Sequence, residues 1–203
     1  MKTNLTLLVA CTFFFAACGS HTKKIIVYAN NDADINQETK AVTQKDTVGH
    51  LDKTIQYSTG DKVSLSVKTF AGSTITVEIP GDGYYIANLK AKDTIIGGFQ
   101  KYSTPEEANR VMSQEQLLHN IDSLNQMIQG INVNAANRTF FILPNTAVKI
   151  TTNTEATIVG PYHRMTSIAK EGDKEPEVYR FYSISEVRET IAKLEKLTGA
   201  QPA

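Results

Sequence analysis

Apolar and polar residues alternate in several short stretches of the first half of the chain. The clearest stretch, Lys62–Lys68, places two valines and a leucine on one side and polar residues between them, and Thr74–Ile79 repeats the pattern. A period of two is typical of half-buried antiparallel strands, and turns containing Gly and Asp separate the stretches. We interpret residues 24–102 as an antiparallel β-sandwich-like domain. Its predicted strands lie at 25–28, 54–58, 62–68, 74–79 and 84–89.

The pattern changes in the middle of the chain. Thr104, Pro105 and Glu107 predict a helix start, because the threonine can cap the helix, the proline suits its first position and the glutamate completes a capping box. Apolar residues at steps of three and four then predict an amphipathic helix over residues 104–130. A second capping pattern begins at Ser113, so two helices joined there are an alternative.

A second β-rich region and a last helix follow. Ser183, with Glu186 three residues later, predicts the start of a helix over 184–198, which Gly199 ends. The predicted strands of this region lie at 140–143, 147–151, 156–159 and 178–182. We interpret residues 103–203 as a smaller α+β domain, with its helix at 104–130, strands within about 139–182 and a C-terminal helix at 184–198, so the chain as a whole is α+β. In an alternative interpretation the helical segment packs across both β regions, which are then not separate domains.

The first 17 residues do not fit a folded domain. One charge at Lys2 precedes an apolar run from Leu5 to Ala17 that only two threonines interrupt. This pattern predicts a secretory signal peptide over residues 1–17. The run covers about 13 positions, whereas a helix needs roughly 20 apolar residues to cross a bilayer.

The end of this signal, Phe15-Ala16-Ala17-Cys18-Gly19, resembles the lipobox of bacterial lipoproteins. Phe15 stands where that family usually has leucine. The resemblance covers about the first 20 residues, and no family is recognised for residues 24–203. It implies cleavage between Ala17 and Cys18, a thioether from Cys18 to diacylglycerol, and acyl chains such as palmitate that bind the lipid bilayer. Alternatively, the signal is an ordinary secretory one and Cys18 is not modified.

The residues after the cysteine bear on location. In Gram-negative lipoproteins an aspartate after the cysteine favours the inner membrane, and this chain has Gly19. Some lineages add an acidic run for surface display, but Lys23 and Lys24 make this segment basic. The resemblance therefore implies an outer-membrane lipoprotein that faces the periplasm. Residues 18–23 form its lipidated tether, in which the five residues 19–23 reach no more than about 18 Å at roughly 3.5 Å per residue.

Charge and motifs exclude several functions. The 203 residues contain 21 basic and 21 acidic side chains, and loss of the signal leaves a net charge near −1, so we expect no nucleic-acid partner. The sequence has no G-x-S-x-G elbow, phosphate loop or dinucleotide fingerprint, so we expect no cofactor and assign no catalytic residue. No two histidines stand three or four positions apart, as a local zinc pair requires. Convergence of His50, His119 and His163 through the fold stays open.

Two groups of residues are weak candidates for binding. Asp32, Asp34, Asn36 and Glu38 imitate the start of a calcium loop, but Gln37 and Thr43 replace its glycine and its last glutamate; turn formation explains these residues as well. The other group is a set of candidate ligand contacts. We expect one ring of Tyr84-Tyr85 to be exposed, and the loop of Tyr162, His163 and Arg164 places an aromatic, an imidazole and a guanidinium side by side.

Two classes of function follow from this pattern. The preferred one is a membrane-anchored, non-enzymatic envelope lipoprotein that binds or positions an envelope protein or glycan. The alternative is a ligand-capture lipoprotein or envelope hydrolase whose site is assembled from distant residues such as Asp32, Asp34, His163 and Arg164.

Overall fold

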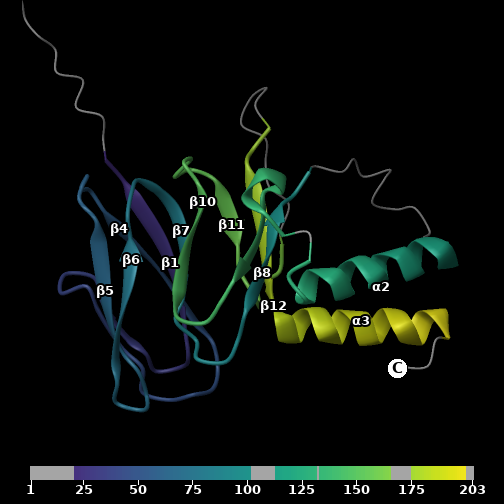
Figure 1. Cartoon of the computed structure of the whole chain (residues 1–203), viewed down its shortest axis with the longest axis horizontal. Coiled ribbons are helices and arrows are strands. Elements are labelled where there is room, and N and C mark those ends of the chain that lie inside the picture. The colour runs from purple at the N-terminus through teal and green to yellow at the C-terminus, as the bar shows by residue number, and fades with distance from the viewer. Residues whose placement is uncertain (1–20, 102–112, 132, 166–174, 200–203) are drawn as a thin grey trace, which may run out of the picture.

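The computed structural model describes residues 21–101, 113–131, 133–165 and 175–199. Within these ranges the chain forms twelve strands in three mostly antiparallel sheets, two α-helices and one 3₁₀ turn, η1 (Ala135–Asn137). Three sheets and a helix pair follow one another across the molecule (Figure 1). The predicted α+β class is confirmed. The predicted signal, Cys18 and the helix start at 104–112 lie outside the described residues.

The central sheet joins strands from both halves of the chain. Its order is β10-β7-β1-β4, with β1 (Lys23–Ala29), β4 (Leu51–Tyr57), β7 (Gly83–Asn88) and β10 (Thr146–Thr151). β1 is antiparallel to β4 and parallel to β7, which is antiparallel to β10. Both inner strands are almost wholly buried and mostly apolar, as expected when other layers cover both faces of a sheet.

The first outer sheet packs on one face of the central sheet. Its order is β2-β3-β5-β6, with β2 (Asp34–Asn36), β3 (Ala41–Thr43), β5 (Val63–Lys68) and β6 (Thr74–Ile79). β5 alternates buried and more exposed residues along its length, because only one of its faces meets the central sheet. The core between these sheets is apolar and includes Ile25, Val27, Leu65, Val77 and Tyr85.

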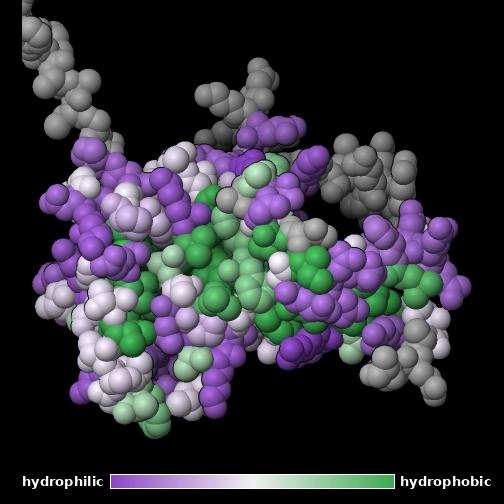
Figure 2. All heavy atoms as spheres, in the orientation of Figure 1, coloured by the Kyte–Doolittle hydropathy of each residue, from purple (hydrophilic) through white to green (hydrophobic). Residues whose placement is uncertain are grey.

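The second outer sheet covers the other face of the central sheet. Its order is β11-β12-β8-β9, with β8 (Ile95–Phe99), β9 (Thr139–Ile142), β11 (Thr157–Val159) and β12 (Val178–Ser183). Ile26, Tyr28 and Ile86 of the central sheet meet Phe140 and Phe181 of this sheet. Polar residues dominate the outer ends of the molecule in Figure 2, and apolar residues reach the surface mainly over the middle.

Two antiparallel helices close the stack, as Figure 1 shows. α2 (Gln114–Ile128) and α3 (Ile184–Thr198) pack on Ile96 and Phe141 of the second outer sheet. The capping box of Ser183 and Glu186 forms as predicted, and Gly199 ends α3 in a left-handed conformation. Ser113 caps α2, which confirms the second capping pattern. No helix in the described ranges has the length and hydropathy to cross a bilayer.

Three strands were not predicted from the sequence. β2 and β3 have three residues each, and β8 carries Gly97 and Gly98, so none offers enough alternation. The division into domains at 102–103 stays a prediction. Hydrogen-bonded sheets extend across that point, because β10 belongs to the central sheet and β8 to the second outer sheet.

Candidate functional site

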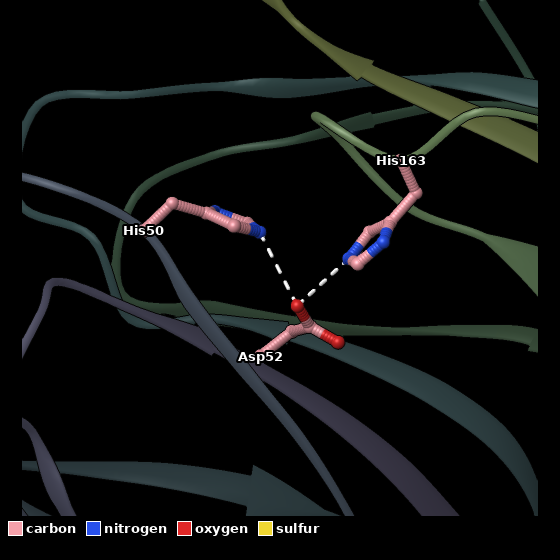
Figure 3. Close-up of side chains that lie close together, drawn as sticks. All are labelled: His50, Asp52 and His163. Carbon is pink, nitrogen blue, oxygen red and sulfur yellow. Dashed lines mark hydrogen bonds and ion pairs between the residues drawn. The ribbon is translucent and has the colours of Figure 1, made fainter.

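Two histidines and an aspartate from distant parts of the chain meet at one end of the central sheet. Figure 3 shows both imidazoles directed at one carboxylate oxygen. Asp52 Oδ1 lies 2.8 Å from His163 Nε2 and 3.4 Å from His50 Nε2. Among the described residues, this is the only group of three or more His, Cys, Asp or Glu side chains whose ligand atoms all lie within 4.8 Å of one another. We call these three residues the His-Asp cluster.

Strand geometry brings His50 and Asp52 together. His50 immediately precedes β4, and Asp52 is the second residue of that strand, so the two side chains project from one face. The preceding turn is held by Asn31, whose Oδ1 accepts the N–H of His50 at 3.2 Å. Gly49 has a φ of 77°, and a Cβ there would lie 2.2 Å from the side chain of Asn31. A glycine at this position therefore permits the turn that presents His50.

His163 arrives from the loop that follows β11. Arg180 Nη1 donates to the carbonyl of Gly160, and Glu186 Oε1 accepts the N–H of Tyr162 at 2.8 Å. Both partners belong to regular structure, since Arg180 lies in β12 and Glu186 in the first turn of α3. The loop is thus held at two points just before His163.

His50 lies between aromatic rings. It stacks on Tyr28 at a centroid distance of 5.6 Å and meets Tyr162 edge-on at 4.7 Å. Both nitrogens of its ring are buried, and neither has a hydrogen-bond partner. The 3.4 Å approach of Nε2 to Asp52 is short enough for an ion pair with a protonated imidazole, but the two groups form no hydrogen bond. Buried polar atoms of this kind are uncommon in native proteins and need an explanation.

Burial lowers the pKa of His50 below its ordinary value, and the nearby charge of Lys90 lowers it further. Asp52 acts in the opposite direction, His163 adds to the lowering, and Glu186 raises the pKa slightly. A neutral imidazole at neutral pH is the result, and a neutral imidazole keeps a lone pair for a ligand.

Two cavities adjoin the His-Asp cluster. One of about 460 Å³ opens beside His50 and Tyr162, where Lys90, Asp93 and Ser185 complete part of its wall. The other, of about 280 Å³, is lined by Asp52 and His163 together with Tyr28, Tyr84 and Thr54. The cluster therefore separates two hollows that a ligand can reach.

A larger cavity of about 600 Å³ lies elsewhere, beside Arg138 and Glu177. Two charged groups of its wall are already paired: Arg138 donates to Glu177 and also to Tyr179, and its guanidinium stacks 3.8 Å from the centroid of Phe99. We therefore favour the smaller cavities at the His-Asp cluster, where polar atoms lack partners.

Some of the predicted contact residues meet at the cluster and others do not. Tyr162 and His163 lie there, and Arg164 follows them on the surface. The expected exposed ring of Tyr84-Tyr85 was wrong: the two residues are 5% and 3% exposed, because both faces of β7 are covered. Tyr84 lines the smaller cavity, whereas Tyr85 faces the first outer sheet.

The weak calcium candidates belong to another part of the fold. Asp34 and Asn36 lie on β2, and Asn36 Oδ1 accepts the N–H of Thr39, which is the role of a turn former. No hydrogen bond or ion pair between described residues joins Asp32 or Asp34 to His163 or Arg164. Of the three histidines considered for convergence, His119 lies exposed on α2 and does not belong to the cluster.

Sequence reasoning missed Asp52. The available signal was the spacing His50-x-Asp52 beside a predicted strand, which places both groups on one face. The pairing with His163, 111 positions away, left no trace in the sequence pattern.

The fold and the cluster define an α+β, β-rich protein with a histidine-carboxylate site at the end of its central sheet. No protein-family model matches the chain, and comparisons with curated proteins and with solved structures find no significant similarity.

The arrangement supports two kinds of chemistry. Two imidazole nitrogens and a carboxylate are ligands for a divalent transition metal. Asp52 and His163 also have the geometry of an acid–base pair. Within the described part of the chain, however, neither imidazole hydrogen-bonds to a serine, threonine or cysteine that it would activate as a nucleophile.

Proposed function

We propose that the protein is a lipid-anchored, non-enzymatic envelope lipoprotein that binds an envelope glycan in the cavity beside His50. The half-exposed ring of Tyr162 carries this proposal, because it lines a 460 Å³ cavity together with polar side chains. Sugars bind in such places by stacking an apolar face on an aromatic ring while polar groups take their hydroxyls. Lys90, Asp93 and Asn30 offer both donors and acceptors there.

In this proposal a lipid on Cys18 anchors the protein in the outer membrane, on the side that faces the periplasm. Support comes from the lipobox-like end of the signal and from Cys18 being the only cysteine that remains after cleavage. An unpaired thiol in an exported protein calls for a use, and acylation provides one.

The position of the cavity agrees with this anchoring. β1 starts at Lys23, which the sequence interpretation assigned to the tether as its last residue, and ends at Ala29, which pairs with Leu51 next to His50. At about 3.3 Å per residue, β1 separates its two ends by about 20 Å. An anchor at Cys18 is thus consistent with a cavity that lies at the far end of β1 from the lipid.

Anchoring is tested by labelling cells with a radioactive or clickable fatty acid and fractionating their envelopes. The native protein is expected to carry the label and to sediment with outer membranes. Cys18→Ser is expected to lose both the label and the sedimentation. An unlabelled native protein contradicts the lipid anchor.

Glycan binding is tested with the Cys18→Ser protein on purified peptidoglycan sacculi and on immobilised lipopolysaccharide. Tyr162→Ala is expected to lose most binding, and Phe70→Ala, which removes another exposed ring that does not line the cavity, is expected to retain it. Equal retention by both variants, or no binding by the parent protein, contradicts the proposal. Capture of a discrete envelope protein through Tyr162 would replace the glycan with a protein partner, and shortened glycan strands would favour a hydrolase.

A further inference from the structure

The donor atoms of the His-Asp cluster lie close to the spacing of a metal site. Asp52 Oδ1 is 2.8 Å and 3.4 Å from the two imidazole nitrogens, and all three donors lie within 4.8 Å of one another. Zinc binds nitrogen and oxygen at about 2.0–2.2 Å, so neighbouring ligands of a tetrahedral site are about 3.3–3.5 Å apart. Small side-chain rotations bring the three donors to these separations.

The unpartnered nitrogens of His50 point to a ligand. Both are buried without a hydrogen bond, whereas His163 Nε2 is bound to Asp52. A metal ion between the three groups gives His50 Nε2 a partner and replaces the hydrogen bond of His163 by a coordinate bond. No described residue hydrogen-bonds to either ring nitrogen of His50.

The surrounding structure holds the ligands in place. His50 and Asp52 belong to one strand and its entry turn, and His163 follows a loop fixed by Arg180 and Glu186. Metal sites need this support, because ligands that are already oriented lose little freedom on binding.

The charges around the cluster are mixed. Lys90 disfavours a cation, but its ammonium group is paired with Asp93 at 3.5 Å. The carboxylate of Asp52 belongs to the cluster itself, and that of Glu186 accepts the N–H of Tyr162, the residue before His163. The carboxylates of Asp52 and Glu186 can therefore balance an ion of charge +2, while Asp93 balances Lys90.

We propose that His50, Asp52 and His163 bind one divalent transition-metal ion, with zinc as the reference ion. Three protein ligands leave at least one coordination position open, as in zinc sites that also bind water or an exogenous donor. Because His50 lines one cavity and Asp52 and His163 line the other, a carboxylate or hydroxyl of a molecule bound there could complete the coordination. Metal binding goes beyond the proposed glycan binding and does not depend on it.

The test is a zinc titration of the full mature chain that carries Cys18→Ser, which removes a competing thiol. Calorimetry or competition with a chromophoric chelator is expected to give one zinc per chain. His50→Ala, Asp52→Asn and His163→Ala are each expected to weaken that binding by at least tenfold. His119→Ala is the matched control, because this histidine is exposed on α2, and it is expected to bind as the parent does.

Cobalt provides a second readout that a folding defect does not mimic. The Co²⁺-loaded parent is expected to show the visible absorption of a four- or five-coordinate site, and His163→Ala is expected to lose it while its circular dichroism stays native. His50→Gln repeats the test with a smaller change of volume. No zinc binding by the parent, or equal binding by His50→Ala and His119→Ala, overturns the metal site.

Glycan binding measured with and without a chelator separates the two proposals. Glycan binding without zinc binding overturns the metal site alone. Zinc binding without glycan binding overturns the glycan proposal alone.

Discussion

The phenol of Tyr28 occupies the space that a side chain at position 160 would need. A Cβ on Gly160 would lie 1.8 Å from the Tyr28 oxygen and 2.6 Å from Cζ. The loop that carries His163 therefore reaches the central sheet because residue 160 has no side chain. Two segments of the His-Asp cluster are brought together by this close approach.

Gly160→Ala is expected to displace the loop and to lower the free energy of unfolding by about 1–3 kcal/mol, the usual cost of overpacking. Urea unfolding measures the loss. Tyr28→Phe removes the nearest atom but leaves the ring, so the double variant is expected to regain only part of it. Native stability in Gly160→Ala would contradict the close approach.

Glu186 is expected to serve the helix and the loop at once. Its Oε2 accepts the N–H of Ser183 and its Oε1 that of Tyr162, each at 2.8 Å. Glu186→Ala is expected to speed hydrogen exchange of the Tyr162 amide. Ser183→Ala is the control: loss of this cap costs about 1 kcal/mol, but the Tyr162 amide is expected to stay protected. Equal exchange in both variants would show that Glu186 acts only as a cap.

Protonation of Glu177 at acidic pH is expected to lower the free energy of unfolding. Burial opposes ionisation of this residue, but hydrogen bonds from Tyr179, Asn153 and Thr151 and the charge of Arg138 outweigh it and lower its pKa. Between the two pKa values, Glu177 is protonated in the unfolded chain but ionised in the folded one. The stabilisation that ionised Glu177 gives the fold is therefore fully present above about pH 4.5 and is lost as the pH falls through the lower folded pKa.

Glu177→Gln is expected to lower stability by about 1–3 kcal/mol at pH 7, because it weakens these hydrogen bonds. It is also expected to flatten the decline below pH 4.5. Denaturant unfolding between pH 3 and pH 7 measures both effects, with the exposed Glu175→Gln as control. A parallel pH profile for the parent and Glu177→Gln would exclude this role.

The buried ammonium of Lys23 is expected to need the carboxylate of Asp82 for the folded state to keep its stability. The Lys23 side chain is fully buried, and its ammonium donates to Thr59 at 2.6 Å and to Asp82 at 3.1 Å. Asp82→Asn leaves that buried charge without a carboxylate. A clear loss of stability is expected, measured by urea unfolding at pH 7.

The control for this pair is Glu78→Gln. It breaks the ion pair with Lys62, in which both side chains are about half exposed. Such surface pairs contribute little, so a change of about 0.5 kcal/mol or less is expected. Similar losses in Asp82→Asn and Glu78→Gln would mean that burial of Lys23 does not matter.

The sequence predicts those parts of the fold that have one exposed face or a local cap. β5 and β6 alternate because solvent covers one side, and Ser183 caps α3 through a residue three positions away. β7 has no exposed face, so the expectation that Tyr84 and Tyr85 point to different environments failed. Whether other sheets cover both faces of a strand depends on the tertiary structure, and the pattern of residues within the strand does not show it.

The candidate site was only partly accessible from sequence for the same reason. Tyr162 and His163 stood out as a local group, whereas Asp52 had no special neighbour in the chain. Their meeting depends on how β4 and the loop after β11 are placed by three sheets. No local rule connects residues so far apart, so the convergence of His50 and His163 was an open alternative.

The strand order of the central sheet also sets when the protein can finish folding. β1 pairs with β4 and with the parallel strand β7, which both come later in the chain. The sheet is complete only when β10 has paired with β7. Long-range and parallel pairings of this kind form slowly, because large loops must close before any contact compensates for them. Until then, β1 and β7 present apolar, unpaired edges that attract other chains. Slow completion of the central sheet therefore lengthens the time for which these edges are exposed.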